Sequence, residues 1–194
     1  MRAFQVEPVP LANQGRVVDA IVLAFTGDPA ARWMYPDAAD YIEHFPEFVR
    51  AFGGRAFESG MVHQAGDFRG ASLWLAPGVH PDDDGVANLI ARSIPERDCA
   101  VMVSLFEQMA QYHPREPHWY LPLIGVEPQE QGNGYGSALL HHALARFDAE
   151  GTLAYLETSN VKNIPFYRRH GFEVMGTIQV GTSPPIVPML RRPL

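Results

Sequence analysis

The chain has a single cysteine, no long hydrophobic run and no excess of basic residues. One cysteine, Cys99, excludes an internal disulfide and a cysteine-based zinc site, and it fits a reducing compartment. No apolar run approaches the roughly 18–20 residues that a membrane span requires. The first eight residues, which end in Glu7 and Pro8, contain no apolar signal core. These absences predict a cytoplasmic protein with no membrane segment.

The charge balance limits the kinds of partner. The chain has 15 basic and 22 acidic residues, which gives a formal net charge of −7. Nucleic acid is therefore not expected as a partner, because phosphate binding requires a basic face. An acidic surface suits an amine-bearing small molecule better. At 194 residues, of which 46% are hydrophobic, the chain is expected to form one domain over residues 1–194.

Apolar periodicity and turn residues predict alternating helices and strands. Asp37 is a candidate N-cap, and Gly53 and Gly54 are candidate stops for the helix between them. The acidic run 82–84 is predicted to be a solvated loop. Helices are predicted over residues 17–25, 37–52, 99–112, 134–149 and 161–169, and strands over residues 61–64, 71–75, 119–126, 153–157, 172–180 and 187–190. The fold class is therefore α/β or α+β.

Three glycines at alternate positions lie between a predicted strand and a predicted helix, at Gly132, Gly134 and Gly136. Glycine allows close backbone approach, and a helix N-terminus favours an anion, so the local pattern predicts a loop that binds phosphate. A P-loop would require a lysine that this segment lacks. The dinucleotide fingerprint fits poorly, because Ser137 occupies the position of its third glycine.

Residues 131–136, Gln-Gly-Asn-Gly-Tyr-Gly, resemble the acyl-CoA loop of the GNAT acetyltransferases, and Val126-x-Pro128 before them matches that motif. Residues 160–172 resemble the second signature of the family, Asn…Tyr-x-x-x-Gly-Phe. The closer resemblance, over about residues 113–194, is to the puromycin N-acetyltransferase-like branch. It implies a mixed sheet of about 6–7 strands with a splayed central pair, flanked by helices. Residues 1–112 would form the acceptor half and residues 113–194 the acetyl-CoA half.

The resemblance also implies where acetyl-CoA binds. Its pantetheine arm would enter the gap between strands 119–126 and 153–157, and Pro122 is compatible with interrupted pairing there. Asn133 stands where many members carry Lys or Arg. The implied cofactor-binding residues are Ile124, Val126, Gln131, Gly132, Asn133, Gly134, Tyr135, Gly136, Ser137, Asn160 and Asn163. A metal is not expected, since the eight histidines include no His-x₃-His pair.

Acyl transfer to an amine requires a general base and an acid for the leaving thiolate. By resemblance, Tyr167 matches the general acid of the family. The base stays open: Glu157 is the leading candidate, and Glu127 and His118 are alternatives. Three aromatic residues of the acceptor half are predicted to contact the substrate: Trp33, Tyr35 and Trp74.

These motifs predict an acetyl-CoA-dependent N-acetyltransferase that acts on a small-molecule amine by direct attack. An aminonucleoside, another amine-bearing drug or a metabolite leads as the acceptor, because of the closer branch resemblance. The alternatives are a protein or peptide N-acetyltransferase, which needs an open groove, and a catalytically silent acyl-CoA-binding regulatory module. The family resemblance also allows a homodimer.

Overall fold

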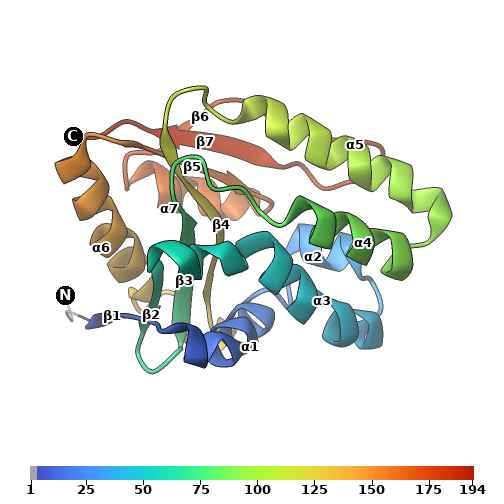
Figure 1. Ribbon diagram of the computed structural model, residues 1–194, viewed down its shortest axis with the longest axis horizontal. Coiled ribbons are helices and arrows are strands. Elements are labelled where there is room, and N and C mark those ends of the chain that lie inside the picture. The colour runs from blue at the N-terminus through green and yellow to red at the C-terminus, as the bar shows by residue number, and fades with distance from the viewer. Residues whose placement is uncertain (1–3) are drawn as a thin grey trace.

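A mixed seven-stranded sheet is the centre of the computed structural model, which describes residues 4–194 (Figure 1). The strand order is β1-β2-β3-β4-β5-β7-β6, and β4 and β5 are parallel neighbours whereas the other pairs are antiparallel. The strands are β1 (Val6–Pro8), β2 (Val62–Ala65), β3 (Gly70–Leu75), β4 (His118–Val126), β5 (Leu153–Thr158), β6 (Glu173–Val174) and β7 (Val187–Arg191). The expected mixed sheet flanked by helices is confirmed. Residues 1–3 of the N-terminal segment, which was expected to lack a signal core, lie outside the described residues.

Helices connect these strands and cover the sheet. The α-helices are α1 (Gln14–Ala24), α2 (Pro29–Met34), α3 (Ala38–Gly53), α4 (Asp83–Ser93), α5 (Glu96–Tyr112), α6 (Tyr135–Glu150) and α7 (Ile164–Arg168). Short 3₁₀ helices are η1 (Leu11–Asn13), η2 (Gly54–Ser59), η3 (Pro128–Glu130) and η4 (Val161–Asn163). The Asp37 carboxylate caps α3, because it accepts from Ala39 N at 2.7 Å. The helix ends at Gly53, as the paired glycines predict.

The two faces of the sheet carry separate hydrophobic cores. Side chains alternate along a strand, so Leu73 and Leu75 of β3 pack with α1, α3 and α4, whereas Trp74 packs on the other face with α6. Figure 1 shows α6 on one side of the strands and α1, α3 and α4 on the other. The sheet is therefore covered by helices on both faces.

Several local predictions differ from the structure. β1, α2 and α4 were not expected. The acidic run is a helix start and not a solvated loop: Asp82 accepts from Gly85 N at 3.0 Å, and Asp83 and Asp84 lie in the first turn of α4. Negative charge there stabilises the positive end of the helix dipole. The strand expected over 172–180 is shorter, since β6 stops at Val174 and only an isolated bridge follows at Ile178.

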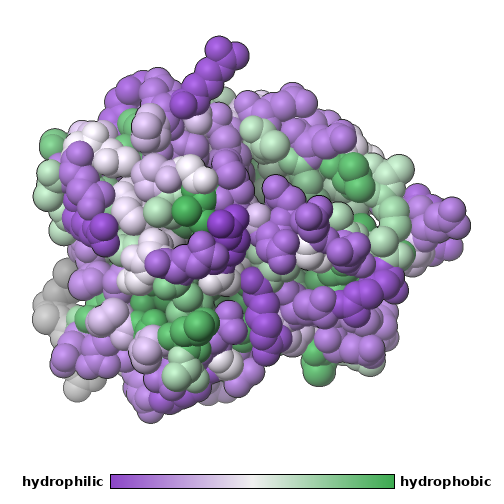
Figure 2. All heavy atoms as spheres, in the orientation of Figure 1, coloured by the Kyte–Doolittle hydropathy of each residue, from purple (hydrophilic) through white to green (hydrophobic). Residues whose placement is uncertain are grey.

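The face drawn in Figure 2 is mainly hydrophilic, and its hydrophobic atoms gather in separate patches. Between residues 4 and 194, no helix combines the length and the apolar character needed to cross a membrane.

Candidate active site

The parallel strands β4 and β5 pair along only part of their length. Their register runs from His118 opposite Leu153 to Leu121 opposite Leu156. β4 continues to Val126 without β5, while it stays paired with β3 as far as Gly70 opposite Val126. The edge of β4 that faces β5 is therefore open beyond Leu121, and the predicted gap between these two strands is present in the structure.

A β-bulge in β4 explains where the pairing stops. Leu75 lies opposite Tyr120 and Leu73 opposite Leu123, so two steps along β3 match three steps along β4. The extra residue lies next to Pro122, which has no N–H to donate to a neighbouring strand. A bulge also turns the side chains that follow it, which places Ile124 at the gap.

The glycine loop leads from β4 into α6. Gly132 and Gly134 have φ values of +82° and +103°, a backbone conformation that favours glycine. Among residues 4–194 no side chain caps α6, and the first internal hydrogen bond of the helix runs from Ala138 N to Gly134 O at 3.0 Å. The backbone N–H groups at the start of the helix therefore have no acceptor within it, and they carry the positive end of the helix dipole.

A groove of about 540 Å³ lies between this loop, the open edge of β4 and α7. All the predicted cofactor-binding residues except Asn133 line it: Ile124, Val126, Gln131, Gly132, Gly134, Tyr135, Gly136, Ser137, Asn160 and Asn163. Asn133 instead bonds Glu130 at the exposed tip of the loop. Arg169 also lines the groove, with its guanidinium 5.0 Å from the centre of the Phe166 ring, and supplies positive charge.

A second cavity, of about 130 Å³, lies on the sheet face covered by α2, α3 and α5. Most of its lining is apolar or aromatic: Phe25, Trp33, Met34, Phe45, Phe48, Phe52, Met102, Leu105, Phe106, Met109 and Ile186. Two carboxylates, Asp28 and Glu157, also line it, and the described lining residues include no basic side chain. The cavity therefore combines an apolar lining with negative charge.

The groove and the cavity meet at five shared residues: Phe25, Asp28, Ile124, Asn163 and Tyr167. Tyr167 is 6% exposed, and burial, followed by the negative charge of Asp28, raises the pKa of its hydroxyl well above the ordinary value. The hydroxyl therefore stays protonated at neutral pH. A molecule in the groove and another in the cavity would approach each other beside it.

Asp28 is held in place by three hydrogen bonds. Its carboxylate accepts from the backbone N–H groups of Ala30 and Ala31, at 2.9 and 3.0 Å, and so caps α2. It also accepts from the Ser159 hydroxyl at 2.5 Å, which ties the start of α2 to the loop after β5. These bonds fix one wall of the junction between the groove and the cavity.

Glu157 of β5 has a side chain that is only 3% exposed. Its Oε1 atom is buried without a hydrogen-bond partner among residues 4–194, and His113 Nε2 lies 3.4 Å from it. Two tyrosines surround the carboxylate. Burial, followed by the charge of Glu157, raises the pKa of both Tyr120 and Tyr155, so both hydroxyls remain neutral. Glu157 is thus a buried carboxylate that faces a cavity and one histidine.

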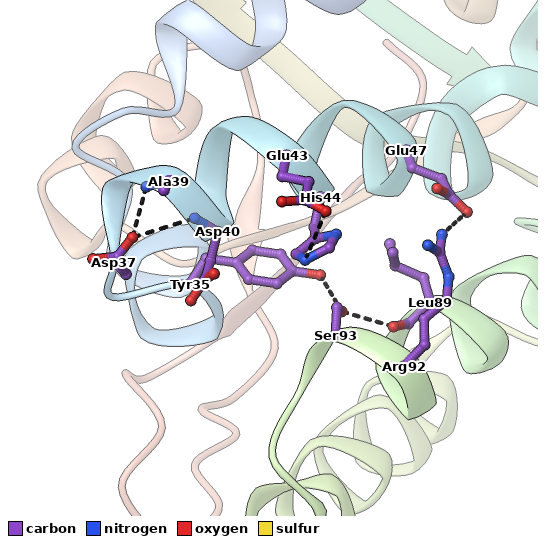
Figure 3. Close-up of polar contacts among 10 residues, drawn as sticks. All are labelled: Tyr35, Asp37, Ala39, Asp40, Glu43, His44, Glu47, Leu89, Arg92 and Ser93. Atoms are coloured by element: carbon purple, nitrogen blue, oxygen red, sulfur yellow. Dashed lines mark hydrogen bonds and ion pairs between the residues drawn. The ribbon is translucent and has the colours of Figure 1, made fainter.

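Two residues predicted to contact the substrate lie elsewhere, and the prediction is corrected for both. Tyr35 is 1% exposed, and its hydroxyl lies 2.8 Å from the Ser93 Oγ atom between α3 and α4 (Figure 3). Trp74 is fully buried against Phe147 on the opposite face of the sheet. Trp33 does line the cavity, and it donates to Thr182 Oγ1 at 3.2 Å.

Glu127, the second candidate base, lines neither the groove nor the cavity and precedes η3. Its backbone N–H donates to Arg69 O at 2.7 Å. His118, the third candidate, does not line the cavity, and its Nε2 atom lies 3.2 Å from His113 Nδ1. Of the three candidates, only Glu157 lines the cavity.

The sequence reasoning missed Asp28 and His113. Asp28 precedes a proline, and that pattern indicated only a turn, although Asp-Pro is also a typical N-cap and first-turn pair. His113 occurs in a proline-rich segment between two elements, and only the tertiary fold brings it to β5.

Comparison with known proteins agrees with this geometry. Residues 95–172 match the model of the acetyltransferase (GNAT) family. An uncharacterized N-acetyltransferase of Schizosaccharomyces pombe is 31% identical over 156 residues, which are 69% of this chain and 60% of that relative. A Corynebacterium glutamicum structure described as histone acetyltransferase HPA2 and related acetyltransferase is 27% identical, with a TM-score of 0.67 and coverage of 100% of this chain and 98% of that one.

Arylalkylamine N-acetyltransferase 2 from Aedes aegypti shares the fold, with a TM-score of 0.68 at 12% identity and coverage of 98% of this chain and 99% of that one. The mixed sheet, the open β4 edge and the glycine loop define a protein of the GNAT fold. With the family match over residues 95–172, the chain is similar to the GNAT N-acetyltransferases both in sequence and in the fold of its described residues. It spans about 60% of the length of the S. pombe relative.

Proposed function

We propose that this chain is an acetyl-CoA-dependent N-acetyltransferase that acetylates the primary amine of a small molecule. The observation that carries the proposal is the meeting of two sites. The groove along the glycine loop and the cavity lined by Glu157, which we call the acceptor cavity, share Asp28, Ile124 and Tyr167. A thioester held in the groove and an amine held in the cavity would therefore react without leaving the protein, because proximity removes the cost of bringing them together.

The groove supplies contacts for each part of acetyl-CoA. The open edge of β4 at Ile124 and Val126 can pair with the amide-bearing pantetheine arm as an added strand. The free backbone N–H groups of Tyr135, Gly136 and Ser137 at the start of α6 suit the pyrophosphate. Acetyl-CoA, when bound, supplies an acetyl group on a thioester; the amine nitrogen forms a C–N bond to it and the C–S bond breaks.

Glu157 is proposed as the general base. An alkylamine with a pKa of about 10 enters as an ammonium ion and must lose a proton before it can attack. A buried carboxylate with an unpartnered oxygen both attracts the ammonium ion and accepts that proton. The Tyr167 hydroxyl, kept neutral by burial and by Asp28, is proposed as the donor to the leaving sulfur.

The lining of the cavity suggests the class of acceptor. Asp28 already accepts three hydrogen bonds, which leaves Glu157 as the carboxylate free to bind a cation. The other side chains that line the cavity are mostly apolar, so a second cationic group on the substrate would be poorly paired. This favours a monoamine with a hydrophobic or aromatic body over a polyamine. Such acceptors include arylalkylamines, and the sequence resemblance to the puromycin N-acetyltransferase-like branch adds aminonucleosides. The cover of α2, α3 and α5 favours a small molecule over a peptide.

The test is release of free thiol from acetyl-CoA by the wild-type chain with a panel of amines. The panel contains an arylalkylamine, puromycin, a polyamine, an aminoglycoside and a short peptide. We expect turnover with a hydrophobic monoamine and its loss by about 10²- to 10⁴-fold in Tyr167→Phe. Thermal stabilisation by acetyl-CoA without turnover on any amine would favour the regulatory alternative, and no stabilisation by acetyl-CoA would refute the proposal.

A further inference from the structure

A line of polar contacts runs from Glu157 away from the acceptor cavity. Glu157 Oε1 lies 3.4 Å from His113 Nε2, and His113 Nδ1 lies 3.2 Å from His118 Nε2. His118 Nδ1 in turn lies 2.9 Å from the carbonyl oxygen of Glu116. Neither histidine lines the cavity. The line thus joins β5, the end of α5 and the start of β4, and its inner end is the carboxylate that the proposed function uses.

The outer end of the line fixes the direction of its hydrogens. A carbonyl oxygen only accepts, so His118 Nδ1 donates to Glu116. Burial lowers the pKa of His118, so its ring is neutral at neutral pH and its Nε2 atom accepts. His113 Nδ1 is therefore the donor to His118. This assignment leaves His113 Nε2 as the atom that faces Glu157.

A carboxylate oxygen and an unprotonated ring nitrogen are both acceptors, and they repel each other when they face at 3.4 Å. One proton between them removes the repulsion, either on Glu157 or on His113 Nε2. The opposite set of tautomers would leave His118 Nδ1 without a hydrogen to donate to the Glu116 carbonyl. A change of tautomers in the two histidines therefore does not remove this repulsion. A proton that Glu157 receives can therefore be passed to His113 Nε2, the acceptor that faces it.

Two neutral aromatic side chains enclose the His113 ring. Its ring packs between Tyr120 and Tyr155, with centroid distances of 4.6 and 4.5 Å, and burial keeps both tyrosines neutral. The other titratable groups near the line are His80 beside His118, Asp83 of α4 on the side of Tyr120, and Tyr112 of α5 on the side of Tyr155.

Access to water differs between the two members of the pair. The His113 side chain is 23% exposed and the Glu157 side chain is 3% exposed. An acceptor molecule in the cavity would cover the remaining face of Glu157. His113 would then be the route by which the carboxylate exchanges its proton with solvent.

We infer that His113 takes the proton of the substrate amine from Glu157 and releases it to solvent, and that His118 is a positioning residue that holds the His113 ring for this transfer. The inference rests on the proposed function. The protons balance: an ammonium nitrogen carries three, one remains on the amide, one reaches the leaving sulfur through Tyr167, and one leaves through Glu157 and His113. The products are the amide, free CoA thiol and one proton in solvent.

The experiment compares His113→Gln and His118→Gln with wild type and with His142→Gln, a matched control at an exposed position of α6. The acceptor is the best alkylamine from the panel, and kcat and KM are measured between pH 7 and pH 9.5, with and without added imidazole. At pH 7 we expect kcat of His113→Gln to fall at least tenfold, with the KM for acetyl-CoA unchanged. His118→Gln should show a smaller loss, and His142→Gln none.

Two further readouts separate a relay from a structural role. The deficit of His113→Gln should shrink as the pH rises, because more of an alkylamine with a pKa of about 10 then enters already neutral. Imidazole should restore part of the rate, since it can accept the proton at the vacated position. A merely structural defect would depend on neither pH nor imidazole.

A kcat of His113→Gln within twofold of wild type at pH 7 would overturn the relay, as would a deficit that neither pH nor imidazole changes. His118→Gln carries the same pH prediction independently, so a poorly folded His113 variant would still leave the relay open to refutation. Failure of the proposed function looks different, because the wild-type chain itself would then release no thiol with any amine.

Discussion

Glu157→Gln is expected to make the protein less active and more stable. The substitution keeps the size of the side chain but removes the carboxylate that faces the acceptor cavity. Loss of a general base typically costs about 10²- to 10⁴-fold in rate, which corresponds to about 3–5 kcal/mol at 1.36 kcal/mol per tenfold change. We therefore expect kcat/KM for an alkylamine to fall by at least a hundredfold at pH 7.

The gain in stability follows from the environment of the same side chain. Oε1 of Glu157 is buried without a hydrogen-bond partner, and a buried polar group in that state costs about 1–3 kcal/mol. A glutamine amide is neutral and can donate to His113 Nε2, which would complete the line of hydrogen bonds to the Glu116 carbonyl. We expect the free energy of unfolding to rise by about 1 kcal/mol, or about 2–4 °C in Tm for a chain of this length.

The assays are thiol release across the pH range and thermal unfolding without ligands. Glu127→Gln serves as the comparison, because Glu127 lines neither cavity and its variant should stay within twofold of wild type in kcat/KM. The reasoning would be refuted if Glu157→Gln kept its rate, or if it lost rate and stability together, since that result would make Glu157 a structural residue.

The remaining predictions concern the groove and the packing that supports it. Gly134→Ala should weaken acetyl-CoA binding, measured by calorimetry, because a φ of +103° costs an alanine about 1–2 kcal/mol and the loop would shift to relieve it. Tyr167→Phe should bind acetyl-CoA as tightly as wild type. Asp148→Asn should lower the free energy of unfolding by about 3 kcal/mol in a denaturant titration, because it breaks the paired contacts of 2.7 and 2.8 Å to the buried Arg191 guanidinium. The hydrogen bond from Arg191 lowers the pKa of Asp148, so this stabilisation is present above the ordinary carboxyl pKa and is lost as the pH falls through the lowered value; the variant should lack that acid dependence.

Signals that act within a few residues could be predicted from the sequence. The Asp37 cap, the stop at Gly53 and the positive-φ glycines of the loop are all local, because they depend on capping atoms and backbone freedom nearby. Pro122 indicated an interruption of β4 for the same reason: its missing N–H acts where it stands. The cofactor side of the site was therefore the more predictable half.

The residues of the acceptor cavity could not be predicted in the same way, because the sequence does not determine which face of the sheet each side chain occupies. Trp74 and its neighbour Leu73 point to opposite faces, and alternation alone does not say which face holds the cavity. Tyr35 lies two residues after the cavity-lining Trp33, but its side chain points toward Ser93. Asp28 and His113 were missed because their roles depend on contacts with residues more than 40 positions away along the chain, Ser159 and Glu157.

The bulge in β4 ties the architecture of both sites to one residue. Removing a residue near Pro122 would bring the strand back into plain pleated alternation, with three steps reduced to two opposite Leu73 and Leu75. The side chains of β4 on one side of the deleted residue would then point to the opposite face of the sheet. Ile124, at the junction of the groove and the cavity, is one of them. One bulge therefore affects both the open edge of β4 at the groove and the wall of the cavity. A change in the length of β4 at this point would alter the two sites together.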